Sequence, residues 1–234
     1  VAVRFIFRSW FFLLVLCCIF ANGEAPLLIC IPGGQPPGRI DSTLGRAISP
    51  HAIMAFQRVK DLDEVLSSYP GAPVISSAAY ARYLPGYAIL LRGRKGQEKK
   101  KKYLIISSNP AVTKNNAAAF RVGIVDFLGR DKLPAFVKDA FGISIVKLKR
   151  VSKKEDLLTL LGMESVDAAI IEESDLVEMR ADTKMKLAVL LQSKAMDSYP
   201  VLASPDPVRC NELRMKLLAQ PKAILHVLDI EGWE

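Results

Sequence analysis

The second half of the chain alternates between short β-rich runs and amphipathic helical segments. Residues 120–125 and 143–151 have the composition of strands, and residues 132–141 between them place their apolar side chains on one helical face. The pattern repeats through a helix at 156–161 and an apolar run at 166–171. Parallel strands need long connections, which are usually helical. The alternation therefore predicts an α/β fold with mostly parallel sheets and helices on both faces.

The first half is less regular, although it contains similar apolar runs. We expect short strands at 27–31 and 73–77, and two apolar runs that flank a basic stretch predict a β-hairpin over residues 85–106. Two helices close the chain, at 207–219 and 221–228. A length of 234 residues leaves room for two small lobes. The expected division assigns residues 24–113 and 200–234 to lobe 1 and residues 114–199 to lobe 2.

An apolar run near the N-terminus has the features of a secretory signal peptide. Residues 10–20 are unbroken apolar sequence, preceded by Arg4 and Arg8 and followed by small residues. This run helps to explain a hydrophobic content of 50% and a mean hydropathy of +0.21, which are high for a soluble chain. It is too short to span a bilayer. We predict that residues 1–23 are a signal peptide and that the mature protein is exported to the periplasm.

Three alternatives to this signal-peptide assignment stay open. Cleavage after Gly23 fits the small-residue pattern best, with Ala21 and Ala25 as other cleavage positions. Lipidation at Cys17 or Cys18 would make the protein a lipoprotein, although the residue before each is not small. An uncleaved N-terminal anchor is the third alternative.

Two cysteines, Cys30 and Cys210, remain after removal of the signal peptide. Disulfides persist in oxidising compartments such as the periplasm, so these two are candidates for a single bridge. The alternative is a pair of separately buried thiols, which behave as small apolar residues.

The positive charge of the chain is concentrated in one stretch. Residues 92–102 hold seven bases and one acid, and with the two arginines of the signal peptide they account for the whole net charge of +8. The stretch contains no aromatic residue to stack on bases, so we expect no nucleic-acid partner. We interpret it as a solvated hairpin tip, with weak contact to an anionic surface as the alternative.

Polar residues that follow the expected strands are the candidate ligand-binding residues. In open α/β sheets, ligands bind outside the carboxyl ends of the strands, where helix N-termini offer free N–H groups. Glu172 and Glu173 follow one such strand, but as first-turn acids they would repel an anion. The candidates are Gly34, Gln35, Ser76, Ser77, Tyr80, Ser107, Ser108, Asn109, Asp126, Phe127 and Arg130.

Candidate catalytic and metal-binding residues are few. His51 and His226 are the only histidines, and neither lies in a motif that defines a nucleophile, a base or a metal site. The sequence has no phosphate-binding loop and no cysteine cluster spaced for zinc. We therefore expect no enzymatic activity, no cofactor and no metal.

Four segments carry a resemblance to a known family: residues 121–130, 149–158, 166–171 and the ending 231–233. In these the chain resembles the type 2 periplasmic binding proteins, in particular the phosphate/phosphonate-type solute-binding branch of ABC transporters. The resemblance implies a two-lobed fold that closes on a ligand by hinge motion, with the ligand in the cleft between the lobes. The Ser-Thr-Ser run with which that branch grips phosphonates is absent, although Ser76-Ser77 and Ser107-Ser108 lie in neighbouring loops.

The expected function is that of an exported solute-binding protein. It would capture a small solute, such as a phosphate- or phosphonate-like anion, for an ABC transporter permease, and it would meet the membrane only through its signal peptide or that transporter. The alternative is a sensory, assembly or interaction protein on the same fold, without a small ligand.

Overall fold

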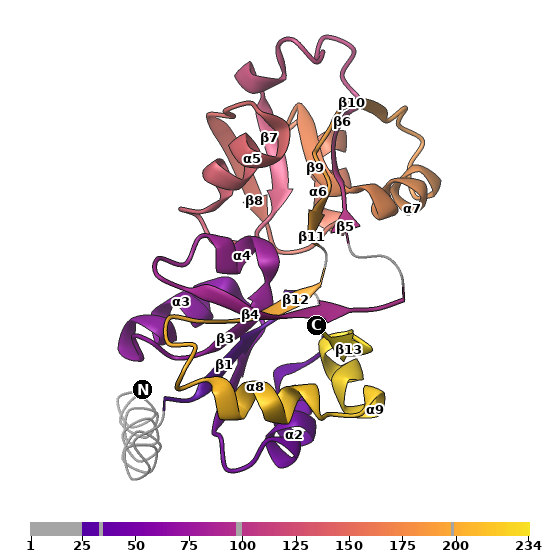
Figure 1. The fold of residues 1–234 in the computed structure, drawn as a ribbon. Coiled ribbons are helices and arrows are strands. Elements are labelled where there is room, and N and C mark those ends of the chain that lie inside the picture. Colours follow the sequence, from indigo (N-terminus) through magenta and orange to yellow (C-terminus); the bar gives the residue numbers. More distant parts are fainter. Residues whose placement is uncertain (1–24, 33–34, 97–99, 198) are drawn as a thin grey trace, which may run out of the picture. The chain divides into compact units, whose positions relative to one another are not determined.

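The computed structural model describes residues 25–32, 35–96, 100–197 and 199–234 (Figure 1). The predicted signal peptide lies outside these residues. The described residues form two compact units: unit 1 comprises those up to residue 77, with 85–95 and 200–234, and unit 2 comprises those of 78–84 and 96–199. In the described part of the chain, no helix has the length and apolar character needed to cross a membrane.

Unit 1 is built on a six-stranded sheet. Its strands follow the order β13-β4-β12-β3-β1-β2, in which β1 (Leu27–Cys30), β2 (Ile53–Phe56) and β3 (Val74–Ser77) are parallel. The other three run antiparallel to their neighbours and are β4 (Ala88–Arg94), β12 (Pro200–Ser204) and β13 (Gly232–Trp233). All four residues of β1 are buried, as expected for a strand covered on both faces.

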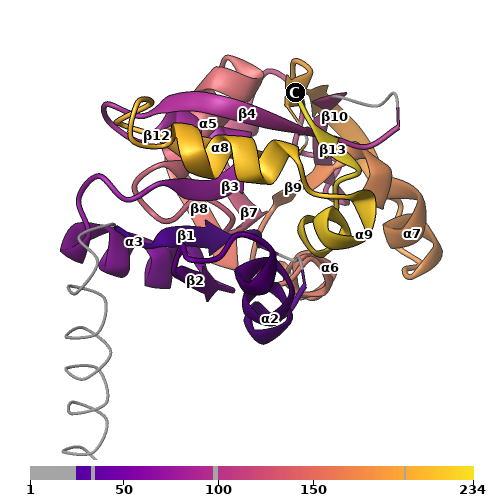
Figure 2. The same cartoon turned by 60° about the horizontal axis from the view of Figure 1, so that its bottom comes forward.

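Helices cover the sheet of unit 1 (Figure 2). Helix α2 (Pro37–Ala47) begins with a proline in its first turn and buries Ile40 and Leu44, which are four residues apart and share a face. Helix α3 (Val59–Ser68) packs against β1 and β2. Two short helices, α8 (Asn211–Leu218) and α9 (Lys222–Leu225), lie in the C-terminal segment and confirm the predicted closing helices.

Unit 2 contains the predicted alternation. Its sheet has the order β10-β6-β9-β7-β8, and β7 (Arg121–Val125), β8 (Lys147–Val151) and β9 (Ala168–Glu172) are parallel. Strand β6 (Tyr103–Ser107) runs antiparallel to both of its neighbours, β9 and β10 (Ala188–Gln192). The helices between strands are α5 (Leu133–Phe141), α6 (Glu155–Gly162) and α7 (Leu176–Ala181). The α/β class predicted from the sequence is confirmed, but both large sheets are mixed and not mostly parallel as we expected.

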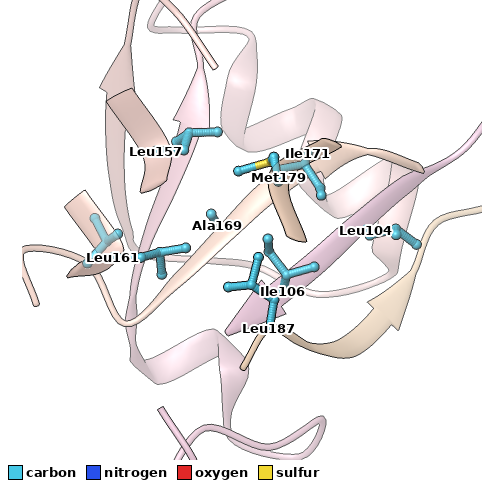
Figure 3. Close-up of a cluster of buried hydrophobic side chains, with 9 residues drawn as sticks. Leu104, Ile106, Leu157, Leu161, Ala169, Ile171, Met179 and Leu187 are labelled. Carbon is cyan, nitrogen blue, oxygen red and sulfur yellow. The ribbon is translucent and has the colours of Figure 1, made fainter. Parts of the chain in front are cut away.

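One face of the unit 2 sheet packs on a cluster of apolar side chains (Figure 3). Strand residues alternate between faces, so Leu104 and Ile106 of β6 share this face, as do Ala169 and Ile171 of β9. Helices α6 and α7 supply the facing side chains. The full cluster is Leu104, Ile106, Leu157, Leu161, Val166, Ala169, Ile171, Met179 and Leu187.

The predicted hairpin over residues 85–106 is wrong. Strand β4 pairs with β12 and β13 in unit 1, whereas β6 pairs with β9 and β10 in unit 2. The loop after β6, which we expected in lobe 1, is likewise part of unit 2, and the chain passes between the units at residues 95–96. The two apolar runs are close in sequence, but their partners are distant, and local pattern does not identify distant partners.

Gly93 of β4 illustrates this correction. It belongs to the stretch 92–102 that we interpreted as a hairpin tip, whereas the structure places it inside a strand. A Cβ atom at this position would lie 2.7 Å from Cγ2 of Ile230 and 2.9 Å from the carbonyl oxygen of Pro200. Gly93 is therefore required by close packing.

The candidate disulfide between Cys30 and Cys210 is not formed. Cys30 and Cys210 are both buried and free, so the alternative of two separate thiols describes the structure. Burial raises the pKa of the Cys30 thiol to about 12, with smaller contributions from the carboxylates of Asp61 and Asp63. The thiol consequently stays protonated and acts as an apolar core group.

Candidate functional site

The topology of unit 2 collects chemically active side chains at one edge of its sheet. The carboxyl ends of β7 and β9 lie at this edge because these strands are parallel. Since β6 is antiparallel, its first residue, Tyr103, pairs with the last residue of β9, Glu172. We call this the carboxyl edge of unit 2; its residues are Lys101–Tyr103, Asp126–Arg130, Glu172–Glu173 and Gln192–Ser193.

Aromatic rings form a rigid platform at the carboxyl edge. The rings of Tyr103 and Phe127 are stacked with centroids 5.6 Å apart and an interplanar angle of 5°. Phe136 of α5 meets both rings edge-on, with centroid distances of 5.1 and 5.0 Å. Burial raises the pKa of Tyr103 well above its ordinary value, and nearby Glu172 and Asp175 add to this effect. Tyr103 therefore stays neutral, and its ring packs in the interior of unit 2.

An ion pair between Lys101 and Glu172 lies beside this platform. Nζ of Lys101 is also 5.4 Å from the centroid of the Tyr103 ring, a distance at which a cation interacts with the ring. The two side chains are 31% and 37% exposed, so a solute has access to both charges. Glu172, which we expected to repel an anion, is thus paired with Lys101.

Glu173 also has a partner. Its Oε1 accepts a hydrogen bond from Nε2 of Gln192 at 2.7 Å. Ser193, the next residue, exchanges hydrogen bonds with the backbone of Tyr103 and fixes the start of β6. The candidate-residue prediction missed Lys101, Tyr103 and Gln192, because finding them requires knowing the direction of β6.

The loop that contains the candidates Asp126, Phe127 and Arg130 is held by its own acid. Oδ1 of Asp126 accepts a hydrogen bond from the backbone N–H of Gly129 at 2.8 Å, and Oδ2 accepts one from Nη1 of Arg150 at 2.6 Å. Gly129 has a φ of +81°, which explains the glycine here. Arg130 is exposed and makes no hydrogen bond or ion pair with any residue that the structure describes. The loop therefore presents Phe127 to the platform and leaves Arg130 available.

Ser107, Ser108 and Asn109 lie at the opposite edge of the same sheet. Ser107 ends β6 and the other two follow it, and the antiparallel direction of β6 carries its end to the amino ends of β7 and β9. Oγ of Ser107 donates to the carbonyl oxygen of Asp167 at 2.5 Å and accepts from the N–H of Asn109 at 3.0 Å. The structure thus separates these three residues from Asp126, Phe127 and Arg130.

Arg121 and Asp167 form a further ion pair at this opposite edge. Nη2 of Arg121 donates to Oδ1 of Asp167 and Nε donates to Oδ2, at 2.9 and 3.0 Å. Hydrogen bonding from Arg121 lowers the pKa of the Asp167 carboxyl, although desolvation opposes the shift. This bidentate pair ties the starts of β7 and β9 together.

Unit 1 has its own carboxyl edge, at the ends of β1, β2 and β3. Ser76 lies here in register with Cys30, is fully buried, and its Oγ has no hydrogen-bond partner among the described residues. Gln35 follows β1 and accepts a hydrogen bond from Nη1 of Arg39 at 3.1 Å. Gly34 lies outside the described residues. The edge therefore offers one unsatisfied hydroxyl and one side-chain amide.

Ser77 and Tyr80 are close in sequence, yet they belong to different units. Ser77 ends β3 in unit 1, whereas Tyr80 lies on the short helix α4 (Ala78–Arg82) in unit 2. Tyr80 is fully buried, and Nζ of Lys132 lies 4.8 Å from the centroid of its ring. Tyr80 is therefore a packing residue of unit 2.

Within the described ranges, no group of three or more His, Cys, Asp or Glu side chains is arranged to hold a metal ion. His51 is mostly buried, with its Nε2 3.9 Å from Oε1 of Glu212. The ion pair of Lys101 and Glu172 lies at the carboxyl edge of unit 2, whereas the edge of unit 1 carries the neutral side chains of Ser76 and Gln35.

No protein-family model matches the sequence, and no curated protein matches it. Among solved structures, the chain is similar to XAC2383 from Xanthomonas citri bound to ATP, with 13% identity over 90% of each chain and a TM-score of 0.67. XAC2383 bound to chloride is similar at 11% identity, over 90% of this chain and 91% of that one, with a TM-score of 0.60.

The periplasmic VFT2 domain of Bordetella pertussis BvgS is also similar in outline, at 10% identity over 90% and 94% of the two chains, with a TM-score of 0.46. At these identities the likeness concerns the fold and no particular branch of a family. The chain therefore shares the fold of XAC2383, and its division into two α/β units agrees with the two-lobed α/β architecture predicted from the sequence.

Proposed function

We propose that the protein is a solute-binding protein exported to the periplasm. It captures a small phosphate- or phosphonate-like anion and delivers it to the permease of an ABC transporter. The fold and the predicted signal peptide support this role. The similar protein XAC2383 has been observed with ATP and with chloride, and both are anions. The proposed activity is binding without catalysis.

The observation that carries this proposal is the accessible ion pair of Lys101 and Glu172 beside Tyr103. A solvated Lys–Glu pair contributes little to stability, about 0–1 kcal/mol, so a ligand exchanges with one partner at low cost. A phosphate-like anion would replace Glu172 as the partner of Lys101.

The same ion pair favours a second class of ligand, a zwitterionic solute such as an amino acid. Lys101 would then bind the carboxylate and Glu172 the ammonium group, beside the aromatic platform. The two classes differ in what they require of Glu172, because a carboxylate repels a phosphate and attracts an amine.

Thermal unfolding of the protein without residues 1–23 tests this function, in the presence of phosphate, phosphite, phosphonates, sulfate, carboxylates and amino acids. A ligand present at 100 times its dissociation constant adds about 2.7 kcal/mol to the free energy of unfolding and raises the midpoint by several degrees. We expect Lys101→Ala to abolish the shift for either class. Glu172→Gln should preserve a phosphate shift and abolish an amino-acid shift.

Asp167→Asn is the matched control, because it removes an acid from an ion pair at the opposite edge of the same sheet. It should leave the ligand-induced shift unchanged. A ligand shift that persists in Lys101→Ala would remove Lys101 from the site. The absence of any shift across the panel would favour the alternative of an interaction or sensory protein.

A further inference from the structure

Strand β8 is an open edge of the unit 2 sheet. It pairs with β7 over five residues in regular parallel register, and no other strand pairs with it in the described chain. The N–H of Asp126 donates to the carbonyl oxygen of Val151 at 2.8 Å, so the backbone polar groups of Val151 point toward β7. Because this direction alternates along a strand, Leu148 and Arg150 direct their N–H and C=O groups outward.

The other edge strands of the described sheets are less suited to pairing. The register of β10 shifts between Val189 and Leu191, which interrupts its ladder of backbone groups. Helix α2 packs along β2, and β13 has only two residues. Strand β8 therefore presents the longest regular, uncovered edge in the described chain.

A groove of about 700 Å³ lies beside β8 and the first turn of α5. Three bases line it, Arg130, Lys149 and Arg150, against one acid, Asp131. Its apolar walls include Leu133, Ile145 and Val146, and Val146 is 87% exposed. The edge strand is thus accompanied by a basic groove with apolar surface.

Lysines on an edge strand oppose pairing with a second copy of the same strand, because like charges would face each other. The same charges complement an acidic chain. Lys149 is exposed and makes no ion pair within the part of the chain that the structure describes, so its charge is available to a partner. The positive charge of this edge therefore favours an acidic segment as its occupant.

We propose that the outer edge of β8 binds an extended acidic segment of a partner protein as an additional strand. The partner backbone pairs with the outward N–H and C=O groups of Leu148 and Arg150. Its acidic side chains face Lys149 and Arg130, and its apolar side chains cover Val146. This is recognition by strand addition, in which backbone hydrogen bonds supply affinity and side chains supply specificity.

Fluorescence anisotropy with a labelled peptide in which Glu alternates with Val tests the proposal, using the protein without residues 1–23. Two further peptides have the same charge but carry backbone N-methyl groups, one on the Glu residues and one on the Val residues. Because the direction of backbone N–H groups alternates along a strand, either the N–H groups of the Glu residues or those of the Val residues point toward β8, but not both. We expect one N-methylated peptide to lose binding and the other to bind like the parent.

Lys149→Glu should weaken binding of the parent peptide about tenfold or more, equivalent to about 1.4 kcal/mol. Lys186→Glu, at an exposed lysine near the opposite edge strand, is the matched control and should bind as the original protein does. Equal binding of both N-methylated peptides would show charge attraction alone and overturn strand addition. Sedimentation that reveals a dimer of the protein alone, lost in Lys149→Glu, would assign the edge to a second copy and overturn the proposal.

Discussion

Gly123 of β7 and Leu157 of α6 should be coupled energetically, because their packing leaves no room for a methyl group between them. A Cβ atom on Gly123 would lie 3.0 Å from Cδ2 of Leu157 and 3.5 Å from a methyl group of Val166. Leu157 is fully buried in the cluster of Figure 3. The backbone of Gly123 does not require a glycine, since it has no positive φ. Packing against Leu157 is thus the physical reason for a glycine here.

The expected changes in free energy of unfolding follow from this contact. Leu157→Ala removes three buried carbon atoms and should cost about 3 kcal/mol in free energy of unfolding. Gly123→Ala gains about 0.5–1 kcal/mol from the unfolded chain but forces the core apart, for a net cost of about 1 kcal/mol. In the double variant the new methyl group enters the space left by Leu157. We expect a total cost of about 2.5 kcal/mol, so the two substitutions are coupled by about 1.5 kcal/mol.

Urea unfolding followed by far-UV circular dichroism measures these three values in the protein without residues 1–23. Gly38→Ala, in α2 of unit 1, is the matched control because a Cβ there meets no atom within 4 Å. It should be neutral or stabilising, and its effect should add to that of Leu157→Ala. If the Gly123 and Leu157 substitutions are also additive within about 0.5 kcal/mol, the packing argument is refuted.

Two further predictions concern titrating groups. Cys30 should resist iodoacetamide at pH 8 in the folded protein and react in urea, as measured by mass spectrometry, because its pKa is raised to about 12 and the thiolate is the reactive form; rapid labelling of the folded protein would contradict its burial. The pKa of Asp167 is lowered from 3.8 by Arg121, so the stability from this pair is present above pH 3.8 and is lost as the pH falls through the lower folded value. The difference in thermal unfolding midpoint between the original protein and Asp167→Asn should therefore shrink on acidification below pH 3.8. A difference that stays constant down to pH 2 would show that the pair does not titrate with folding.

The part of the fold that could be predicted from sequence is the part set by local patterns. The helical face of residues 132–141 is an example: Leu133, Phe136, Val137 and Ala140 are buried as their spacing indicates. Strands β7, β8 and β9 were also predictable, because each is separated from the next by a helix long enough for a parallel crossover. These features depend on neighbours within a few tens of residues.

Pairing between distant segments could not be predicted in the same way. Strands β4 and β6 were interpreted as a hairpin because the sequence between them is short, polar and contains glycines. The actual partner of β4 is β12, more than a hundred residues away, and β6 enters the sheet of the other unit. Sequence pattern gives the apolar face of a strand but neither its partner nor its direction.

The direction of β6 decides which residues reach the candidate site. A strand that runs antiparallel to its neighbours brings its beginning, and not its end, to the carboxyl edge. Ser107 and Asn109 are consequently placed at the far edge and serve the local structure there. Lys101 and Tyr103, which precede and begin the strand, are placed beside Glu172.

The direction of β6 also changes our interpretation of the basic stretch at residues 92–102. We interpreted residues 92–102 as a solvated hairpin tip, but they contain the first passage of the chain from unit 1 into the sheet of unit 2. Strand β5 (Lys100–Lys101) pairs with β11 (Met196–Asp197), which precedes the return of the chain to unit 1. Since β6 begins at the carboxyl edge, Lys101, two residues before the strand, is brought to that edge by chain connectivity. The charge that composition analysis locates in one stretch therefore supplies the cation at the site where we propose that an anion binds.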